Sequence, residues 1–174
     1  MKYFVKFFVV TFLLLVSTYS FAEQKIAFID MTYVLNKSKA GKGAQDYLNK
    51  TFKENQKKFS NQESDLKKQE IDLLAKKSEM TQDEYKVKAD ELRKKVVDYQ
   101  TKRRDSLEKI ATQRAEARKK LLEKLDPILN KYSDENGFTL ILDKKNVIKG
   151  NTQLDITEPI IEVLNKELPS LNLK

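Results

Sequence analysis

Hydrophobic side chains between residues 38 and 132 recur at helical spacing in two series that match each other. The first series is Phe52, Phe59, Leu66, Leu73 and Met80. The second series is Ala89, Leu92, Val96, Tyr99 and Ile110, with the charged residue Arg103 at the position between the last two. If the series run antiparallel with partner numbers summing to 162, Leu73 lies opposite Ala89 and Leu66 lies opposite Val96. A single turn satisfies both series, so the pattern predicts a helical hairpin arm projecting from a smaller body.

The predicted turn has the sequence of a helix start. Thr81 and Glu84 match a capping box, with Thr81 as the N-cap and the Glu84 side chain reaching back to its backbone. Met80 and Tyr85 stand at the two positions of a hydrophobic staple, which fixes how the chain enters the helix. The first arm helix is therefore expected to end at about Glu79 and to be on the order of 60 Å long.

Polar residues interrupt the predicted seam between the two helices. Alternate seam positions of the first helix are Asn55, Gln62, Gln69 and Lys76. One interpretation is that these residues fix the register of the hairpin at a cost in stability. The other is that they make the arm soft enough to flex around a bound partner. In the same register Arg103 lies opposite Phe59, where we expect a cation–π contact.

The segment before the arm predicts a strand and a tight junction. Lys25–Tyr33 partly alternates and is rich in Ile and Phe, which is typical of a strand. Asn36 or Ser38 is expected to cap the first arm helix. Gly41 and Gly43 lie near the start of that helix, and glycine there indicates close backbone packing where the arm leaves the body.

The returning helix is expected to reach about Tyr132 and to kink or break at Pro127, where Asp126 would cap a final short helix. Gly137 suits the left-handed residue that follows a helix. Beyond it the expected elements are a strand over 138–142, a tight turn at 144–146, a hairpin strand over 147–149, and a helix capped at 155–158 and stopped by Pro169.

These elements predict an α+β fold with three parts. Residues 1–22 combine a positive start, a short apolar run and small residues before a cleavage point, which predicts a secretory signal peptide. Residues 38–132 form the arm, and residues 23–37 with 133–174 form a β-rich body. That body is small, and the chain has no cysteine for disulfides and no plausible metal cluster. We therefore expect the body to oligomerise, with the subunit number left open.

Basic residues outnumber acidic ones, and the excess sits on the arm. The chain has 34 Lys and Arg against 26 Asp and Glu, for a net charge of +8. The candidate anion- or client-binding cations are Lys94, Lys95, Lys102, Arg103 and Arg104. The simplest interpretation is a solvated face balanced by nearby carboxylates. The alternative is attraction to acidic polypeptides or to anionic lipid headgroups.

Several apolar residues of the arm fall off the seam. They are Ile71, Leu74, Val87 and Val97, and three of them cluster near the predicted tip. Single exposed apolar side chains are normal on any protein surface. A weak apolar strip beside basic residues is also typical of a promiscuous polypeptide binder, so these four are the apolar candidates for client contact.

The composition gives no support for catalysis. The chain has no histidine and no cysteine, which removes the commonest general base, the thiolate nucleophile and the thiolate metal ligands. We expect no enzyme activity, no catalytic residues, no metal and no cofactor. The pI of about 9.4 raises nucleic-acid binding, but the predicted export, the mixed charge and the lack of a groove-reading motif argue against a specific nucleic-acid partner.

Three segments together resemble the Skp (OmpH) family of periplasmic chaperones. They are KIAFIDMTYVLN at 25–36, ENGFTLILDKKNVIKG at 135–150 and DITEPIIEVLNKEL at 155–168. The arm resembles the family only in character, because coiled-coil sequence is permissive.

The resemblance implies a jellyfish-like homotrimer, in which a central body of strands carries three helical hairpins around a cavity. It also implies a periplasmic, ATP-independent holdase that binds unfolded outer-membrane β-barrel proteins and prevents their aggregation, with contacts to lipopolysaccharide or membranes. The alternative from the residues alone is a structural coiled-coil scaffold of the envelope that binds no client.

Overall fold

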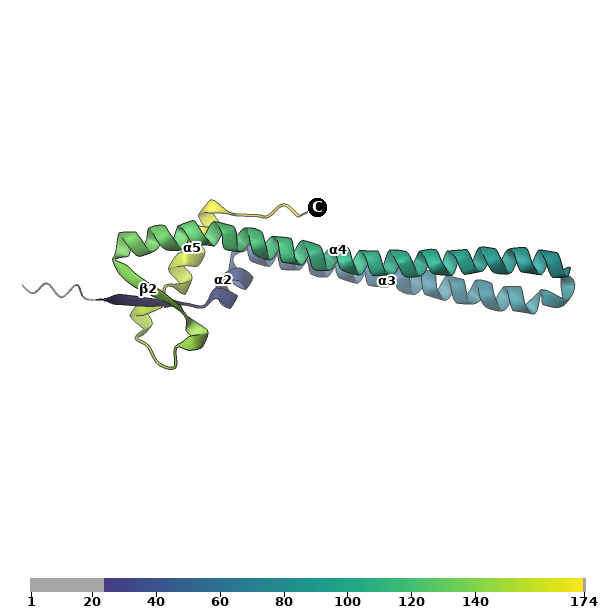
Figure 1. Cartoon of the computed structure of the whole chain (residues 1–174), viewed down its shortest axis with the longest axis horizontal. Coiled ribbons are helices and arrows are strands. Elements are labelled where there is room, and N and C mark those ends of the chain that lie inside the picture. The colour runs from purple at the N-terminus through teal and green to yellow at the C-terminus, as the bar shows by residue number, and fades with distance from the viewer. Residues whose placement is uncertain (1–23, 174) are drawn as a thin grey trace, which may run out of the picture.

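A computed structural model of the chain describes residues 24–173, and it shows a small body at one end of a long helical hairpin (Figure 1). The predicted signal peptide at 1–22 lies outside the described residues. The strands and α-helices are β1 (Lys25–Ile29), α2 (Met31–Lys37), α3 (Lys39–Ala75), α4 (Gln82–Asn136), β2 (Phe138–Asp143) and α5 (Thr157–Glu167). The predicted order of strand, helical hairpin, strand, strand and helix is confirmed except for the second of the two later strands, and the α+β class is confirmed.

The body is built on a parallel pair of strands. β1 lies beside β2, with Ala27 opposite Ile141 and Phe28 opposite Leu142. Helices α2, α5 and the end of α4 pack around this pair. Their shared core consists of Ala27, Ile29, Val34, Leu35, Ala40, Leu121, Leu125, Ile128, Ile156, Ile160, Ile161 and Leu164.

The predicted hairpin after β2 is wrong. Residues 147–149 form no strand, and the side chain of Ile148 is fully exposed. β2 instead satisfies its backbone against β1, and the chain turns away through the 3₁₀ helix Lys144–Asn146, where the Asp143 carboxylate accepts from the Lys145 N–H. The loop then returns to the body, where Asp155 bridges to Phe28.

The first predicted strand is too long by four residues. β1 ends at Ile29 because the Asp30 carboxylate accepts a hydrogen bond of 2.8 Å from the backbone N–H of Tyr33 and starts helix α2. The apolar residues that follow, Met31 among them, belong to α2 and pack against the core. An Asp in the N-cap position therefore overrides the β-like composition of the segment.

Of the two predicted caps for the first arm helix, Ser38 is the one used. Its hydroxyl accepts from the Gly41 N–H at 3.2 Å, and its side chain is buried. Close packing at Gly41 is confirmed, because a Cβ there would lie 1.8 Å from the Leu35 carbonyl oxygen. The same prediction for Gly43 is wrong, since nothing lies within 4 Å of its Cβ position.

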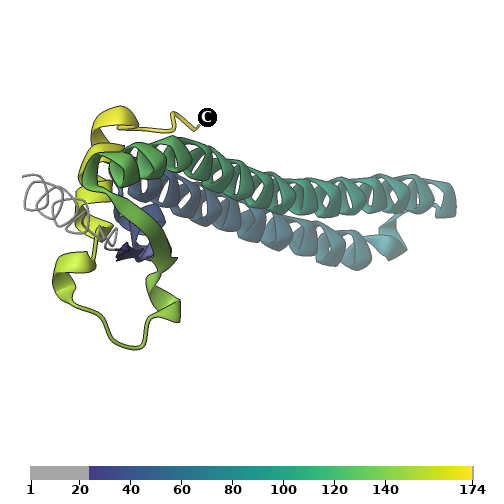
Figure 2. The same cartoon turned by 60° about the vertical axis from the view of Figure 1, so that its left-hand side comes forward.

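The hairpin arm forms in the predicted register. Tyr99 donates to the Glu63 carboxylate at 3.2 Å and Asn55 donates to Ser106 at 2.8 Å, and both cross-helix pairs fit the expected pairing to within one residue. Figure 2 shows the two helices side by side along the whole arm. The expected cation–π contact between Arg103 and Phe59 is not found among residues 24–173. Phe59 instead meets the ring of Tyr99 edge-on, with 6.0 Å between the ring centroids.

The turn follows the predicted chemistry with one difference in length. The capping box is confirmed, with Thr81 accepting from the Glu84 N–H and the Glu84 carboxylate accepting from the Thr81 N–H. Helix α3 ends at Ala75, four residues earlier than expected. The 3₁₀ helix Lys77–Glu79 then makes the reversal, because its tighter winding lets the chain change direction within a few residues.

The predicted break at Pro127 is wrong. Helix α4 runs continuously through Pro127 and reaches Asn136, so Asp126 is an interior residue and caps nothing. Leu125 and Ile128 are both buried in the body core on either side of the proline, and their packing holds the helix together there. Gly137 ends the helix at φ 68°, as expected for a left-handed residue.

Helix α5 starts differently from the expected 155–158 cap. Its N-cap position is Ile156, which has no side-chain capping bond. The Asp155 carboxylate one residue earlier accepts from the Thr157 N–H at 3.0 Å, and the Thr157 hydroxyl accepts from the Asp30 N–H at 2.9 Å. These bonds tie the start of α5 to the residue that follows β1, so they join segments of the body that precede and follow the arm.

Candidate binding surface on the helical arm

The arm has no buried residue over its outer length. Leu48 and Ile110 are buried, but no residue from 49 to 109 is. Seam side chains such as Leu66 and Val96 reach only partial burial, because each helix has a single neighbour to cover it. The predicted seam residue Phe52 remains 42 % exposed for the same reason. The outer arm is therefore mostly surface, with a shallow apolar stripe between its helices.

Of the predicted basic residues, two are held by carboxylates of their own helix. Lys102 pairs with Asp98 at 2.7 Å, and Arg104 lies 3.4 Å from Asp105. Lys95 crosses to the other helix and donates to Gln69 at 2.9 Å. These contacts match the first interpretation of the basic excess, a solvated face balanced by local carboxylates.

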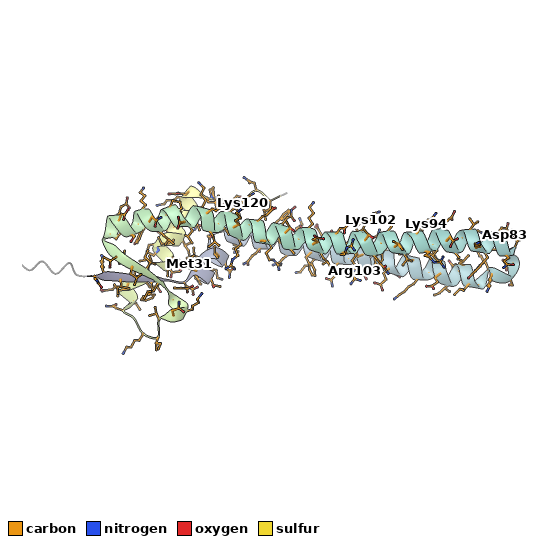
Figure 3. The ribbon with its side chains drawn as sticks, in the orientation of Figure 1. Met31, Asp83, Lys94, Lys102, Arg103 and Lys120 are labelled. Atoms are coloured by element: carbon orange, nitrogen blue, oxygen red, sulfur yellow. The ribbon has the colours of Figure 1, made fainter. Side chains whose placement is uncertain are left out.

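The other two basic candidates differ in position. Arg103 lines two of the hollows between the helices, so its guanidinium lies at the seam. Lys94 lies on α4 in the middle of the arm, where Figure 3 labels it with Lys102 and Arg103. The five predicted cations therefore line one stretch of α4 and do not converge on one point.

The predicted apolar residues are exposed, as expected from their positions off the seam. The exposed fractions are 65 % for Ile71, 55 % for Leu74, 58 % for Val87 and 57 % for Val97. The antiparallel register brings the first three to the same end of the arm, near the turn. Each is a single exposed side chain on a helix, so they offer several weak contacts along the surface and no enclosed site.

A hollow with a volume of about 570 Å³ lies between the two arm helices, toward the turn. Its apolar lining comes from Leu66, Leu73, Leu74, Ala89, Leu92 and Val96. Its charged lining comes from Glu63, Lys67, Glu70, Arg93 and Arg103. It brings Leu74 and Arg103 together among the predicted residues. An apolar floor with mixed charges at its edge suits amphipathic chain segments better than one defined small ligand.

Charged groups around this hollow are partly neutralised by each other. Hydrogen bonds from Lys67 and then from Tyr99 lower the pKa of Glu63 below its ordinary value, so this carboxylate stays ionised in neutral solution. Lys67 itself lies 3.3 Å from Glu63. The charge on this surface is thus alternating in sign, which favours many transient contacts over strong attraction to one anion.

The polar seam residues behave differently from one another. Asn55 and Gln69 make the cross-helix bonds to Ser106 and Lys95 described above, which supports their role in fixing register. Gln62 lies between them, and its Oε1 atom is buried without a hydrogen-bond partner within residues 24–173. An unsatisfied buried acceptor weakens the seam locally. The middle of the arm therefore contains both a register-fixing layer and a destabilising one.

A second hollow, which sequence reasoning missed, lies where the arm meets the body. It has a volume of about 350 Å³ and is enclosed by α2, the first turns of α3 and the facing part of α4. Arg114 and Arg118 of α4 line it, and neither is among the candidate binding residues predicted from the sequence. The signal that was available is their spacing of four residues around Ala117, which places both on the side of α4 that faces α3.

Together the body, the capped hairpin and the exposed arm define a class of protein, a small α+β body that carries a long two-helix arm. Residues 25–164 match the family model described as outer membrane protein, OmpH-like, and the chain belongs to this family. The resemblance found in the sequence is therefore confirmed.

Two relatives show how far the likeness extends. A Skp-like protein of Pseudomonas aeruginosa is 27 % identical over 166 residues, covering 95 % of this chain and 99 % of that protein. The crystal structure of an OmpH-like chain from Caulobacter crescentus, described as an outer membrane chaperone, superposes with a TM-score of 0.80 at 18 % identity. It covers 91 % of this chain and 94 % of its own, and it shows that the fold is shared.

No helix within residues 24–173 is both long enough and apolar enough to cross a membrane.

Proposed function

We propose that this protein is an ATP-independent holdase chaperone of the periplasm that binds unfolded outer-membrane proteins and prevents their aggregation. The observation that carries the proposal is the outer arm, residues 49–109, which is fully helical apart from its turn yet has no buried residue. A long surface that mixes apolar and charged side chains suits many unrelated unfolded segments. The relatives described as Skp-like and as an outer membrane chaperone support the same function.

Binding in this proposal is the sum of weak contacts. Ile71, Leu74, Val87 and Val97 offer separate apolar contacts, and the cations of α4 attract acidic clients over a range of about 8 Å at ~0.15 M salt. Several arms that share one client raise the overall affinity without a tight single site. Release then needs no nucleotide and no catalytic chemistry, and follows when the client folds elsewhere.

The proposed assembly is a homotrimer held by the bodies, with three arms around a cavity. The support within this chain is the exposed surface of the strand pair, where Ile26 and Leu140 are 39 % and 48 % exposed. A two-stranded sheet is marginal in isolation and is stabilised by further strands or packing. Export through the signal peptide at 1–22, and contact with lipopolysaccharide or an anionic membrane surface, are parts of the same proposal.

The decisive experiment measures aggregation of an outer-membrane barrel protein diluted from urea, followed by light scattering. We expect suppression at one trimer per client and none from an unrelated coiled-coil protein of similar charge. Absence of suppression would favour the alternative function, a structural coiled-coil scaffold. The ion-paired helix faces of the arm would also suit such a scaffold.

A charge variant tests whether the arm binds clients while the body alone forms the oligomer. Glutamine is introduced at Lys94, Lys95, Lys102, Arg103 and Arg104. We expect weaker client capture at low salt with an unchanged oligomer by light scattering. Loss of the oligomer in this variant would contradict a body that assembles independently of the arm.

A further inference from the structure

The hollow where the arm meets the body, here called the neck cavity, has a lining unlike that of the outer arm. Its apolar lining consists of Leu35, Gly41, Ala44, Leu48, Ala117 and Leu121. Its polar lining consists of Asn36, Gln45, Asn49, Arg114 and Arg118. Among these lining residues there are two cations and no carboxylate, whereas the hollow near the turn is lined by both signs of charge.

The two guanidiniums of the neck cavity have no carboxylate partner, unlike the ion-paired cations of the same helix. Lys102 and Lys119 pair with carboxylates four residues away on α4. Arg114 and Arg118 have only Ile110, Ala111, Ala115, Ala117, Leu121, Leu122 and each other at those spacings. Neither guanidinium has an ion pair or hydrogen bond to any residue from 24 to 173.

Arg114 and Arg118 are both exposed, and their charges are free to attract an anion. Two like charges four residues apart on a helix repel each other weakly, and no carboxylate stands three or four residues from either of them. Guanidinium groups bind carboxylates through two parallel hydrogen bonds, which adds direction to the charge attraction. Arg114 and Arg118 can therefore hold one carboxylate each, or share one between them.

The rest of the lining suits a peptide. Leu48 and Leu121 are largely buried and line the cavity, so they offer an apolar surface for one side chain. Gln45 donates a hydrogen bond to Asn36, while Asn49 has no partner among the described residues. A carboxamide both donates and accepts, as a backbone N–H and C=O require. The volume of about 350 Å³ lies at the small end for ligand pockets and admits a short segment.

We propose that the neck cavity is a specific binding site for a short acidic segment of an unfolded polypeptide, one apolar side chain flanked by carboxylates. The apolar side chain packs on Leu48 and Leu121, and the carboxylates bind Arg114 and Arg118. The source of the segment rests on the proposed chaperone function. The site itself is distinct from the outer arm, since it is small, partly enclosed and of one charge sign.

The test is a direct binding measurement on the purified protein, with a fluorescein-labelled peptide of blocked ends that carries one leucine between two glutamates. Fluorescence anisotropy gives the dissociation constant. We expect Arg114→Gln with Arg118→Gln to weaken binding by at least about tenfold, as does replacing the peptide glutamates by glutamine. The matched control is Lys120→Gln with Lys124→Gln, which removes the same charge from α4 outside the cavity and is expected to change binding by less than about twofold.

A conservative variant separates geometry from charge. Arg114→Lys with Arg118→Lys keeps both charges but loses the paired donors, and we expect an intermediate weakening of a few-fold. Unchanged affinity in this variant, or equal weakening in the Lys120 and Lys124 control, would mean diffuse attraction and would overturn the site.

Other occupants give different results. If the Arg114 and Arg118 glutamine variant changes the oligomer by light scattering, a second copy of the chain fills the cavity and the proposal fails. If the arginines are needed for binding phosphatidylglycerol vesicles but not for the peptide, the ligand is a lipid headgroup and the proposal also fails. Loss of peptide binding with intact suppression of client aggregation confirms a distinct site. Peptide binding without any suppression of client aggregation would support the neck-cavity site and contradict the proposed chaperone function.

Discussion

The body and the arm are stabilised in different ways, although helix α4 belongs to both. In the body, side chains from β1, α2, α4 and α5 surround one another, and Val34, Leu125, Ile160 and Leu164 are almost completely inaccessible to solvent. On the outer arm no residue is buried. Helical periodicity alone therefore does not produce a core, because a core needs neighbours on more than one side.

The difference shows what stabilises each region. The body gains free energy from apolar burial, whereas the arm depends on a half-buried seam, a capped turn and exposed ion pairs that contribute little each. An arm of this kind opens locally at a lower free energy than the body unfolds.

Truncating a core residue should separate the two regions most clearly. Ile160→Ala is expected to lower the free energy of unfolding by about 2–5 kcal/mol, because it leaves a cavity in a fully enclosed site. Leu66→Ala on the arm is expected to cost about half as much or less, since the side chain is only partly buried. Urea titration followed by circular dichroism measures both. Equal losses would mean that the arm has a core after all.

The two glycines at the start of α3 form a matched pair at the boundary between the regions. Gly41→Ala is expected to destabilise the protein by more than about 2 kcal/mol, because the new methyl group would overlap the Leu35 carbonyl. Gly43→Ala meets open space and is expected to stabilise the helix by about 1 kcal/mol. Thermal unfolding compares the two, and opposite signs are the expected result.

A substitution in the turn should lower the local stability of the arm and leave that of the body unchanged. Thr81→Ala removes both hydroxyl bonds of the capping box and is expected to destabilise the tip by about 1 kcal/mol. Hydrogen exchange should rise in the residues on either side of the turn and stay unchanged in β1 and β2. Thr101→Ala, an exposed threonine within α4, is the control. Faster exchange in the body would show that the regions are coupled.

A pH effect should appear in the body. Burial raises the pKa of Asp155, but hydrogen bonds from Lys144 and Thr157 outweigh it and lower the pKa below the ordinary 3.8. The same pair, at 2.7 Å, raises the pKa of Lys144 above 10.5. A lowered carboxylate pKa stabilises the fold above pH 3.8, and this contribution is lost as the pH falls through the folded-state value.

The size of this effect is small because Lys144 is about half exposed to solvent. We expect Asp155→Asn to lose less than about 1 kcal/mol at neutral pH and to show a smaller further loss on acidification than the natural protein does. Asp46→Asn, at an exposed carboxylate of α3, is the matched control. Melting temperatures between pH 2 and 7 measure the difference, and parallel curves for natural protein and Asp155→Asn would contradict it.

Several local features could be predicted from the sequence, although the Asp30 cap that ends β1 was not. The hairpin register, the Thr81 cap, the Ser38 cap and the left-handed Gly137 all depend on residues close in sequence or on one repeated period. Each is decided by hydrogen bonds and side-chain spacing within a few turns. The family resemblance was found from the same short segments.

Long-range pairing could not be predicted in this way. The parallel pairing joins β1, which precedes the arm in the sequence, with β2, which follows it. The sequence instead favoured a local hairpin between β2 and residues 147–149. Pro127 was judged by helix propensity, although burial of its neighbours decides its conformation. The pair Arg114 and Arg118 was missed because only the folded junction shows that α2 closes a cavity over them.

The parallel strand pair has a consequence for how this architecture can change. Because β1 and β2 lie side by side, the whole hairpin is an insertion between two neighbouring strands, and its two ends meet at the body whatever its length. Seven residues added to each helix would keep the seam in phase and extend the reach by roughly 10 Å. The length of the arm can therefore change independently of the body, and related chains can differ in arm length while keeping the same body.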